Sequence, residues 1–336
     1  MSATIFQSSS PPRRIDMHVH MVGNGSNGSG AWLRLSGWHQ WLAGFMLRQV
    51  GFPQSTLTGD LEAIFVSKLV GWIRDSSLDA VVLLAHEQVH DSDGTPRPDL
   101  GSMYVPNDLV LQLGRQYPEL LPGVSIHPAR PDAVDELNRC AEQGAVLMKC
   151  LPNCQNIDLS DRRYEPFWRR MAELRMPLLA HTGGEHTVPV INSAFADPKL
   201  LRYPLECGVD VIAAHCGTSS GAFDKDYFDD WVAMLSRFPN LFGDISAMVS
   251  LNRCGHLRDC LEPEILRRIL HGSDFPVPVL GHRLWLQGPM DRRTFRRIQG
   301  ISNPLERDWQ FKEAIGFGSA TLTGADDLLR PTRQPA

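Results

Sequence analysis

The sequence contains 336 residues, of which 43% are hydrophobic, and its 33 Lys and Arg residues stand against 38 Asp and Glu residues, for a net charge of −5. This composition is ordinary for a globular protein, and the small negative charge provides no basic field for nucleic acid. No apolar run approaches the roughly 20 residues that a membrane-spanning helix needs. We therefore expect neither nucleic acid nor a membrane as a partner.

Cysteine usage and the N-terminal segment predict a cytoplasmic protein. The segment from Met1 to Pro12 is rich in Ser and Pro and lacks the apolar stretch of a signal peptide. The seven cysteines are odd in number and irregularly spaced, which favours free thiols in a reducing compartment over a disulfide framework. Cys150 and Cys154 lie four residues apart, but a cysteine-type zinc site would need a second such pair.

The first predicted strand begins at Ile15 and ends with His18-Val19-His20. A loop rich in Gly, Ser and Asn follows over 23–30, and the aromatic, apolar stretch over 32–50 then predicts a helical insertion. This insertion would serve as a lid, as a partner surface (for instance in a homo-oligomer), or as a plain packed segment. The sequence leaves these three roles open.

Beyond the insertion, short apolar runs alternate with amphipathic helical stretches, as buried parallel strands covered by helices do. With the first run, the units number eight and predict an α/β fold, a (β/α)8 TIM barrel over about residues 14–318, in one domain spanning 1–336. A further helix over 303–316 would pack outside the barrel, and residues 330–336 would form a polar tail. The predicted strands are Ile15–His20, Ala80–Ala85, Leu121–Ile126, Ala145–Lys149, Pro177–His181, Val209–His215, Leu241–Ile245 and Ile269–Asp274.

Polar side chains stand where several of these strands end, which is where barrels of this kind carry their active sites. His18 and His20 share one face of their strand because residues two apart do so, and imidazole is the commonest protein ligand for zinc. One strand-end histidine is easily a satisfied core residue, but the whole set predicts a metal site. The other members of the set are Lys149 on the fourth strand, His181 on the fifth, His215 on the sixth and Asp274 on the eighth.

Lys149 has three possible roles, because a buried lysine is costly unless its charge is balanced. It would hold a substrate carboxylate as a free ammonium, bridge two metals after carboxylation by carbon dioxide, or extend out of the barrel mouth. His271 is expected to point away from Asp274 and to be structural. Other candidates for substrate contact, each equally suited to local hydrogen bonding, are His86, Glu87, His127, Glu185, His186 and Asp244.

The order and strand positions of these residues resemble the ligand pattern of the amidohydrolase superfamily, and the resemblance spans about residues 14–318. The surrounding sequence is similar to the amidohydrolase-related (amidohydrolase 2) branch at 148–153, 179–183, 272–276 and 303–307. For a two-metal site, the resemblance implies that one ion is bound by His18, His20 and Asp274 and the other by His181 and His215. A carboxylated Lys149 would bridge the two ions. In one-metal members, His18, His20, His181 and Asp274 hold a single ion and His215 assists catalysis.

The resemblance implies a metal-dependent hydrolase that uses a metal-activated water on a small-molecule substrate, with one or two divalent ions and zinc as the favoured metal. Zinc lowers the pKa of a bound water to about 7. Asp274 would accept its proton and deliver it to the leaving group, and His215 would assist. The bond cleaved would be the C–N bond of an amide or the C–O bond of an ester or lactone. The alternatives are a one-metal lyase, decarboxylating or hydrating a carboxylic acid, and a non-catalytic barrel that binds partners through its insertion.

Overall fold

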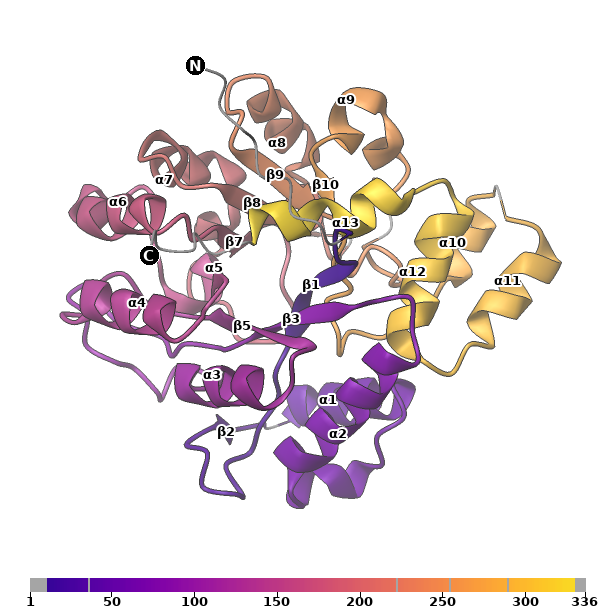
Figure 1. Cartoon of the computed structure of the whole chain (residues 1–336), viewed down its shortest axis with the longest axis horizontal. Coiled ribbons are helices and arrows are strands. Elements are labelled where there is room, and N and C mark those ends of the chain that lie inside the picture. The colour runs from indigo at the N-terminus through magenta and orange to yellow at the C-terminus, as the bar shows by residue number, and fades with distance from the viewer. Residues whose placement is uncertain (1–10, 36, 222, 254, 289, 330–336) are drawn as a thin grey trace.

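The apolar runs of the sequence form eight parallel strands that alternate with helices around a barrel, which confirms the predicted fold class (Figure 1). The computed structural model describes residues 11–35, 37–221, 223–253, 255–288 and 290–329, so the predicted polar tail and most of the N-terminal segment lie outside it. In sheet order the strands are β1 (Ile15–His20), β3 (Ala80–Leu84), β5 (Leu120–Val124), β6 (Leu147–Cys150), β7 (Leu178–His181), β8 (Val211–Ala214), β9 (Leu241–Asp244) and β10 (Ile269–Leu270).

The barrel closes between β10 and β1 through the backbone that follows β10. The amide of Met17 donates to the carbonyl of His271 at 3.1 Å, and the amide of Asp274 donates to the carbonyl of His18 at 2.8 Å. Val19 and Phe275 form a parallel bridge one step further along. The predicted eighth strand therefore has ladder pairing only over its first two residues. Its continuation nevertheless runs beside β1 and brings Asp274 next to His18.

Helices cover the outside of the barrel at the places that the sequence predicts. All five residues of β3 are buried, which explains why its sequence is a continuous apolar run rather than an alternating one. No described helix combines the length and the apolar character that crossing a bilayer requires. The helices that precede successive strands are α2 (Leu61–Arg74), α3 (Asn107–Gln116), α4 (Ala133–Glu142), α6 (Glu165–Glu173), α7 (Arg202–Glu206), α8 (Phe228–Leu235) and α9 (Pro263–Leu266).

Several elements lie outside the repeating strand–helix pattern, among them the predicted helical insertion and the predicted helix over 303–316. A small second sheet pairs β2 (Trp32–Leu33) antiparallel with β4 (Met103–Tyr104), and the insertion after β1 forms α1 (Gly37–Gln49). Figure 1 shows β2, α1 and α2 together on one side of the barrel. The remaining helices are α5 (Pro152–Gln155), α10 (His282–Leu286), α11 (Arg292–Gln299), α12 (Pro304–Ala314) and α13 (Ser319–Leu328).

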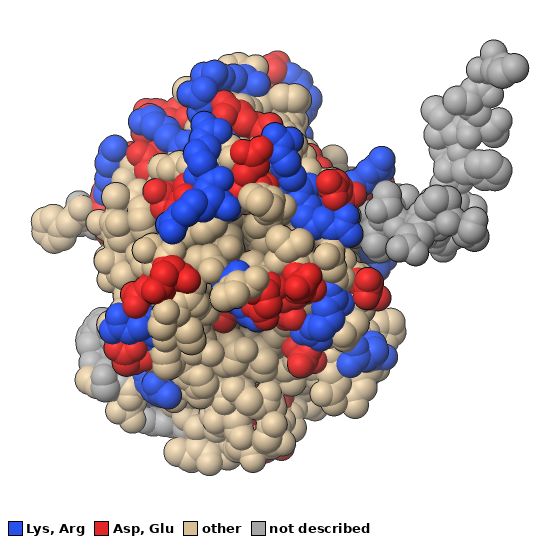
Figure 2. All heavy atoms as spheres, turned by 90° about the vertical axis from the view of Figure 1, so that its left-hand side faces the viewer, with Lys and Arg blue, Asp and Glu red and all other residues tan. Residues whose placement is uncertain are grey.

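Exposed charges form local pairs rather than fields of one sign on the face drawn in Figure 2. Arg169 pairs with Glu165 one turn away on α6, and Arg202 pairs with Glu206 in the same way on α7. Exposed pairs of this kind contribute about 0.3–0.5 kcal/mol each. The surface charges therefore contribute little to the stability of the barrel.

The Asn303-Pro304-Leu305-Glu306 motif starts α12 and attaches it to the end of α2. The side-chain oxygen of Asn303 caps the helix by accepting hydrogen bonds from the amides of Leu305 and Glu306. Its side-chain nitrogen donates to the carbonyl of Trp72 at 2.8 Å. The motif thus fixes the helix that packs outside the barrel closure.

A buried ion pair within α12 includes a lysine that bonds to the segment after β10, which carries Asp274. The Nζ of Lys312 donates to the carbonyl of Gly272 at 2.8 Å and pairs with the Asp308 carboxylate one turn earlier. Both side chains of the pair are fully buried. Removing one member of a buried ion pair is costly, because it leaves the other charge buried and unpaired. The pair therefore holds α12 firmly against the backbone beside the site.

Replacing Lys312 by Met should leave the Asp308 carboxylate without its partner. In the wild-type protein this carboxylate is ionised at pH 7.5, since burial raises its pKa to about 6 and the Lys312 ammonium prevents a larger rise. Breaking such a pair from one side costs about 3–5 kcal/mol, and urea unfolding followed by circular dichroism should show that loss. Arg169→Ala, which breaks an exposed pair, should cost less than about 1 kcal/mol. Equal losses in the two variants would refute the anchoring role.

Candidate metal centre

Three donor atoms converge at the mouth of the barrel. The Nε2 of His18 lies 3.2 Å from the Nε2 of His20, and the Oδ1 of Asp274 lies 3.2 Å from each of them. Two ligands of one ion, each about 2.0–2.2 Å from it, are separated by about this distance. The two histidines share a face of β1, and the backbone bond between Asp274 and His18 brings in the carboxylate. The three side chains therefore fit a single divalent ion.

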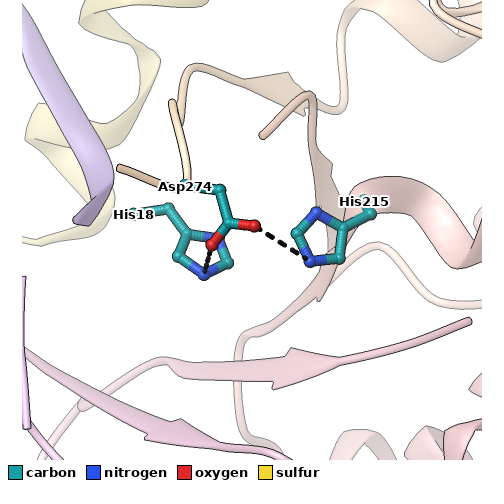
Figure 3. Close-up of side chains that lie close together, drawn as sticks. All are labelled: His18, His215 and Asp274. Atoms are coloured by element: carbon teal, nitrogen blue, oxygen red, sulfur yellow. Dashed lines mark ion pairs between the residues drawn. The ribbon is translucent and has the colours of Figure 1, made fainter. Parts of the chain in front are cut away.

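His215 lies on the other side of the Asp274 carboxylate (Figure 3). Its Nε2 is 3.9 Å from the Oδ2 of Asp274, and ligand atoms of His18, His215 and Asp274 all lie within 4.8 Å of one another. Oδ1 of Asp274 thus faces the β1 pair, while Oδ2 faces His215. This carboxylate is the group that connects the first set of donors to the histidine after β8.

His215 and Asp274 both have left-handed backbone, with φ of 62° and 64°. This conformation is uncommon for residues with a Cβ atom, costs about 1–3 kcal/mol, and is found mostly where function requires it. Each residue is held by its own amide, since that of His215 donates to the Asp244 side chain and that of Asp274 donates to the carbonyl of His18. The surrounding hydrogen bonds therefore maintain the strained backbone at the site.

The Asp244 carboxylate at the end of β9 holds the ring of His18 and the backbone of His215. Its Oδ2 accepts from Nδ1 of His18 at 2.7 Å, and its Oδ1 accepts from the amide of His215 at 2.8 Å. The Nδ1 of His215 donates to the carbonyl of Ser246 at 2.9 Å. Because Nδ1 carries the proton in each ring, both Nε2 atoms face the site as acceptors. Asp244 therefore has the local hydrogen-bonding role that sequence analysis left open beside substrate contact.

The charge states of these groups suit a divalent cation. Burial lowers the pKa of His18 and lowers that of His215 much further, so both rings are neutral at pH 7. Burial alone would raise the pKa of Asp244 and Asp274, but the adjacent donors, His18 above all, lower both values below the ordinary range. Neutral imidazole and ionised carboxylate are the forms that bind metal.

Lys149 and His181 are buried at the same end of the barrel, and each has one side-chain nitrogen without a hydrogen-bond partner. The Nζ of Lys149 and the Nε2 of His181 have no hydrogen-bond partner among the described residues. Burial lowers the pKa of Lys149 and lowers that of His181 to about 3. The His181 ring meets that of His215 edge-on, with 5.1 Å between centroids. Unpartnered buried polar atoms are costly, and a bound ion would give the Nε2 of His181 a partner.

The remaining sequence candidates have local roles or line cavities. Glu87 pairs with Arg130 at 2.7 Å, and His271 packs its ring against Trp309, in agreement with its expected structural role. His127 is buried beside His90. The candidates that line cavities at the mouth of the barrel are His86, Glu185 and His186.

Arg253 is a polar residue near the site that sequence analysis missed. It is 5% exposed, and its guanidinium donates to the carbonyls of Thr218 and Gly184. It also lines a chamber that borders Asp274. Because it lies on the loop after β9 rather than at a strand end, no sequence pattern marked it.

The donor atoms open into a cavity that we call the mouth pocket. It leaves about 890 Å³ free of protein atoms, part of it open to solvent. A small molecule can therefore reach the donors. Helix α1 forms one wall of this pocket, so the insertion after β1 covers the site as a lid would. The site residues that line the pocket are His20, His181, His215 and Asp274, and those from α1 are Ala43, Met46 and Leu47.

The family model described as Amidohydrolase matches residues 98–292, more than half of the chain. The chain belongs to the amidohydrolase family. The matched range holds Lys149, His181, His215 and Asp274, whereas the two histidines of β1 precede it. This family is metal-dependent, and the His18, His215 and Asp274 group could bind a metal.

Solved structures with the same fold resemble this amidohydrolase-family protein over most of its length. An uncharacterised TIM-barrel protein from Bordetella bronchiseptica is 16% identical, with a TM-score of 0.56, over 89% of this chain and 99% of that one. A putative 2-pyrone-4,6-dicarboxylic acid hydrolase from Pseudomonas putida is 15% identical, with a TM-score of 0.54, over 94% and 98%. A probable hydrolase of the same description from Acinetobacter baumannii, with citric acid bound, is 14% identical, with a TM-score of 0.53, over 93% and 99%. A search of curated proteins finds no match.

Asp244→Asn should weaken zinc binding by this amidohydrolase-family protein about 10–100-fold, the usual effect of losing the acceptor behind a ligating histidine. The amide retains an oxygen but not the charge that orients Nδ1 of His18. Competition with a chelating dye measures the dissociation constant, and thermal unfolding checks the fold. Asp229→Asn, an exposed change of the same kind on α8, is the matched control. Unchanged zinc affinity in a folded D244N protein would contradict the orienting role.

Proposed function

We propose that this protein is a metal-dependent hydrolase that cleaves the C–N bond of an amide, or the C–O bond of an ester or lactone, in a small molecule. The observation that carries the proposal is the 3.2 Å spacing of the donor atoms of His18, His20 and Asp274 beside an open pocket. We further propose a cytoplasmic location, since the six cysteines described by the structure are free thiols.

A divalent ion at these donors, with zinc favoured, would lower the pKa of a water to about 7 and so supply hydroxide at neutral pH. Asp274 is the proton carrier in this proposal because its carboxylate is ionised and lines the mouth pocket. It accepts a proton and later delivers it to the leaving nitrogen or oxygen. With a single ion bound, the neutral Nε2 of His215, 3.9 Å from Oδ2, would share that proton and, once charged, stabilise a developing oxyanion; with two ions bound, this atom would be a metal ligand instead.

We assign His18, His20 and Asp274 to one ion and His181 and His215 to a second, with Lys149 between them. The unpartnered, buried atoms of Lys149 and His181 support this division, as does the ring contact between His181 and His215. A charged lysine beside divalent ions would be repelled by about 4 kcal/mol per unit charge at 4 Å and an effective dielectric of 20. We therefore propose that Lys149 does not remain a cation when the metals bind.

Carboxylation of Lys149 resolves this repulsion. Burial lowers the pKa of the lysine, and its neutral amine attacks carbon dioxide: an N–C bond forms, a proton is released, and an anionic carbamate replaces the ammonium.

The second candidate function rests on the same unpartnered Nζ. If the ammonium persists and contacts a substrate carboxylate, a one-metal lyase acting on a carboxylic acid becomes the better proposal.

Asp274→Asn should lower hydrolysis of amide, ester or lactone substrates by at least about 10²–10⁴-fold, the contribution of a positioned general base. The amide cannot accept a proton, and it is also a poorer metal ligand. Turnover is measured at saturating zinc, with metal content determined on the same samples. Asp229→Asn should retain wild-type rates. Near-normal turnover in a metal-loaded D274N protein would refute the proton-carrying role.

Lys149→Ala separates the hydrolase from the lyase. Wild-type protein prepared with zinc and bicarbonate should bind two ions, and the alanine variant should bind fewer, because it lacks the bridging carbamate. Metal analysis after gel filtration gives the stoichiometry, and Lys199→Ala, an exposed lysine on the outside of the barrel, is the control. One ion bound with equal affinity by wild type and K149A would exclude the bridge and favour the lyase.

A further inference from the structure

The walls of the mouth pocket have a composition that narrows the substrate class. Twelve of the twenty residues that line it are apolar, and neither Lys nor Arg is among these described lining residues. Ligand pockets place a few polar groups in a mostly apolar wall to orient the ligand. Here four of the eight polar lining residues are candidate metal donors, so the rest of the wall is mostly apolar.

The apolar wall is built by segments outside the repeating strand–helix pattern. Helix α1 contributes Ala43, Met46 and Leu47, while the two strands of the small second sheet contribute Leu33 and Met103. The pairing of β2 with β4 therefore holds two apolar side chains against the same cavity as α1. Both segments follow strands at the catalytic end of the barrel, where loops determine substrate choice.

The side chains of fixed charge that face the mouth pocket are acidic. Glu185 and Asp274 are among its described lining residues, and neither Lys nor Arg is. A substrate carboxylate away from the metal donors would be buried without a cation and would be repelled by Glu185.

A buried arginine, Arg253, lines the adjoining chamber together with Ser250 and Asn252. A charged substituent in the apolar part of the mouth pocket would therefore lose its hydration without gaining a partner. Burial of an uncharged hydrocarbon group there is favourable, because it removes apolar surface from water.

We infer that the substrate carries a bulky, uncharged, apolar body that fills the mouth pocket and presents its reacting carbonyl to the Asp274 end. This inference rests on the proposed hydrolase function and specifies its substrate class. Neutral lactones, esters or amides with alkyl or aryl substituents meet the requirement, and dicarboxylic acids do not.

Binding of unreactive ketones tests the substrate class without turnover. Zinc-loaded protein is titrated calorimetrically with cyclohexanones that bear ethyl, butyl or hexyl tails. Each added methylene should tighten the dissociation constant about three- to fourfold, the usual gain from burying a methylene. A tail of equal length that ends in a carboxylate should bind at least tenfold more weakly than the neutral ketone. Affinity that is independent of tail length, or tighter for the carboxylate or for 2-pyrone-4,6-dicarboxylic acid, would overturn the inference.

Two variants locate the tail in the mouth pocket. Ala43→Phe should fill it and Met46→Gln should make its wall polar, and either should abolish most of the gain per methylene at unchanged zinc content and melting temperature. Gln40→Phe, at an exposed position of the same helix, is the matched control. If the folded A43F and M46Q proteins kept the full gain in affinity per methylene, the tail would not lie in the mouth pocket.

The corresponding alkyl lactones are assayed for hydrolysis in parallel. Tail-dependent ketone binding without hydrolysis would refute the proposed function but support the substrate class. Hydrolysis that does not depend on tail length would support the function and overturn the substrate class.

Discussion

The Asp244 carboxylate is the constraint on which the site depends, because it bonds to groups from two separate parts of the barrel. One oxygen holds the ring of His18 on β1, and the other holds the backbone of His215 after β8. Gly272 leaves room for this approach, since a Cβ there would lie 2.7 Å from the Cβ of His18 and 3.3 Å from Oδ2 of Asp244. Packing therefore requires a glycine at position 272, which lies two residues before Asp274 in the Gly-Ser-Asp sequence.

Buried polar groups fix the backbone next to the candidate metal ligands. Asp16, fully buried on β1, accepts through Oδ1 from the amides of His18 and Ser273, at 3.1 and 2.9 Å. It thus joins the two segments that close the barrel, each next to a donor residue. Lys312 acts from the outside by bonding to Gly272. Because the contact between Asp16 and Ser273 spans the closure, the convergence of His18, His20 and Asp274 is a consequence of how the barrel closes.

The sequence predicts those features that depend on local pattern. Buried parallel strands appear as continuous apolar runs, so all eight barrel strands were predicted, although the last is shorter than expected, and the strand-end residues lie at one rim. The two-residue strands β2 and β4 are too short to show a period, and their pairing joins residues some 70 positions apart. The orienting role of Asp244 and the burial of Arg253 likewise arise only from tertiary contacts. The proposed substrate preference depends on β2, β4 and α1, and the pattern of candidate metal ligands alone did not indicate it.

Anomalous diffraction from crystals of zinc-loaded protein tests the central claim most directly. The account predicts an anomalous peak within ligand distance of Nε2 of His18, Nε2 of His20 and Oδ1 of Asp274, with a second peak beside His181 and His215 when Lys149 is carboxylated. Data at the zinc edge and just below it identify the metal, and density at Nζ shows the carbamate. Crystals that contain zinc elsewhere on the protein, with no peak among these three donors, would contradict the assignment of the metal centre.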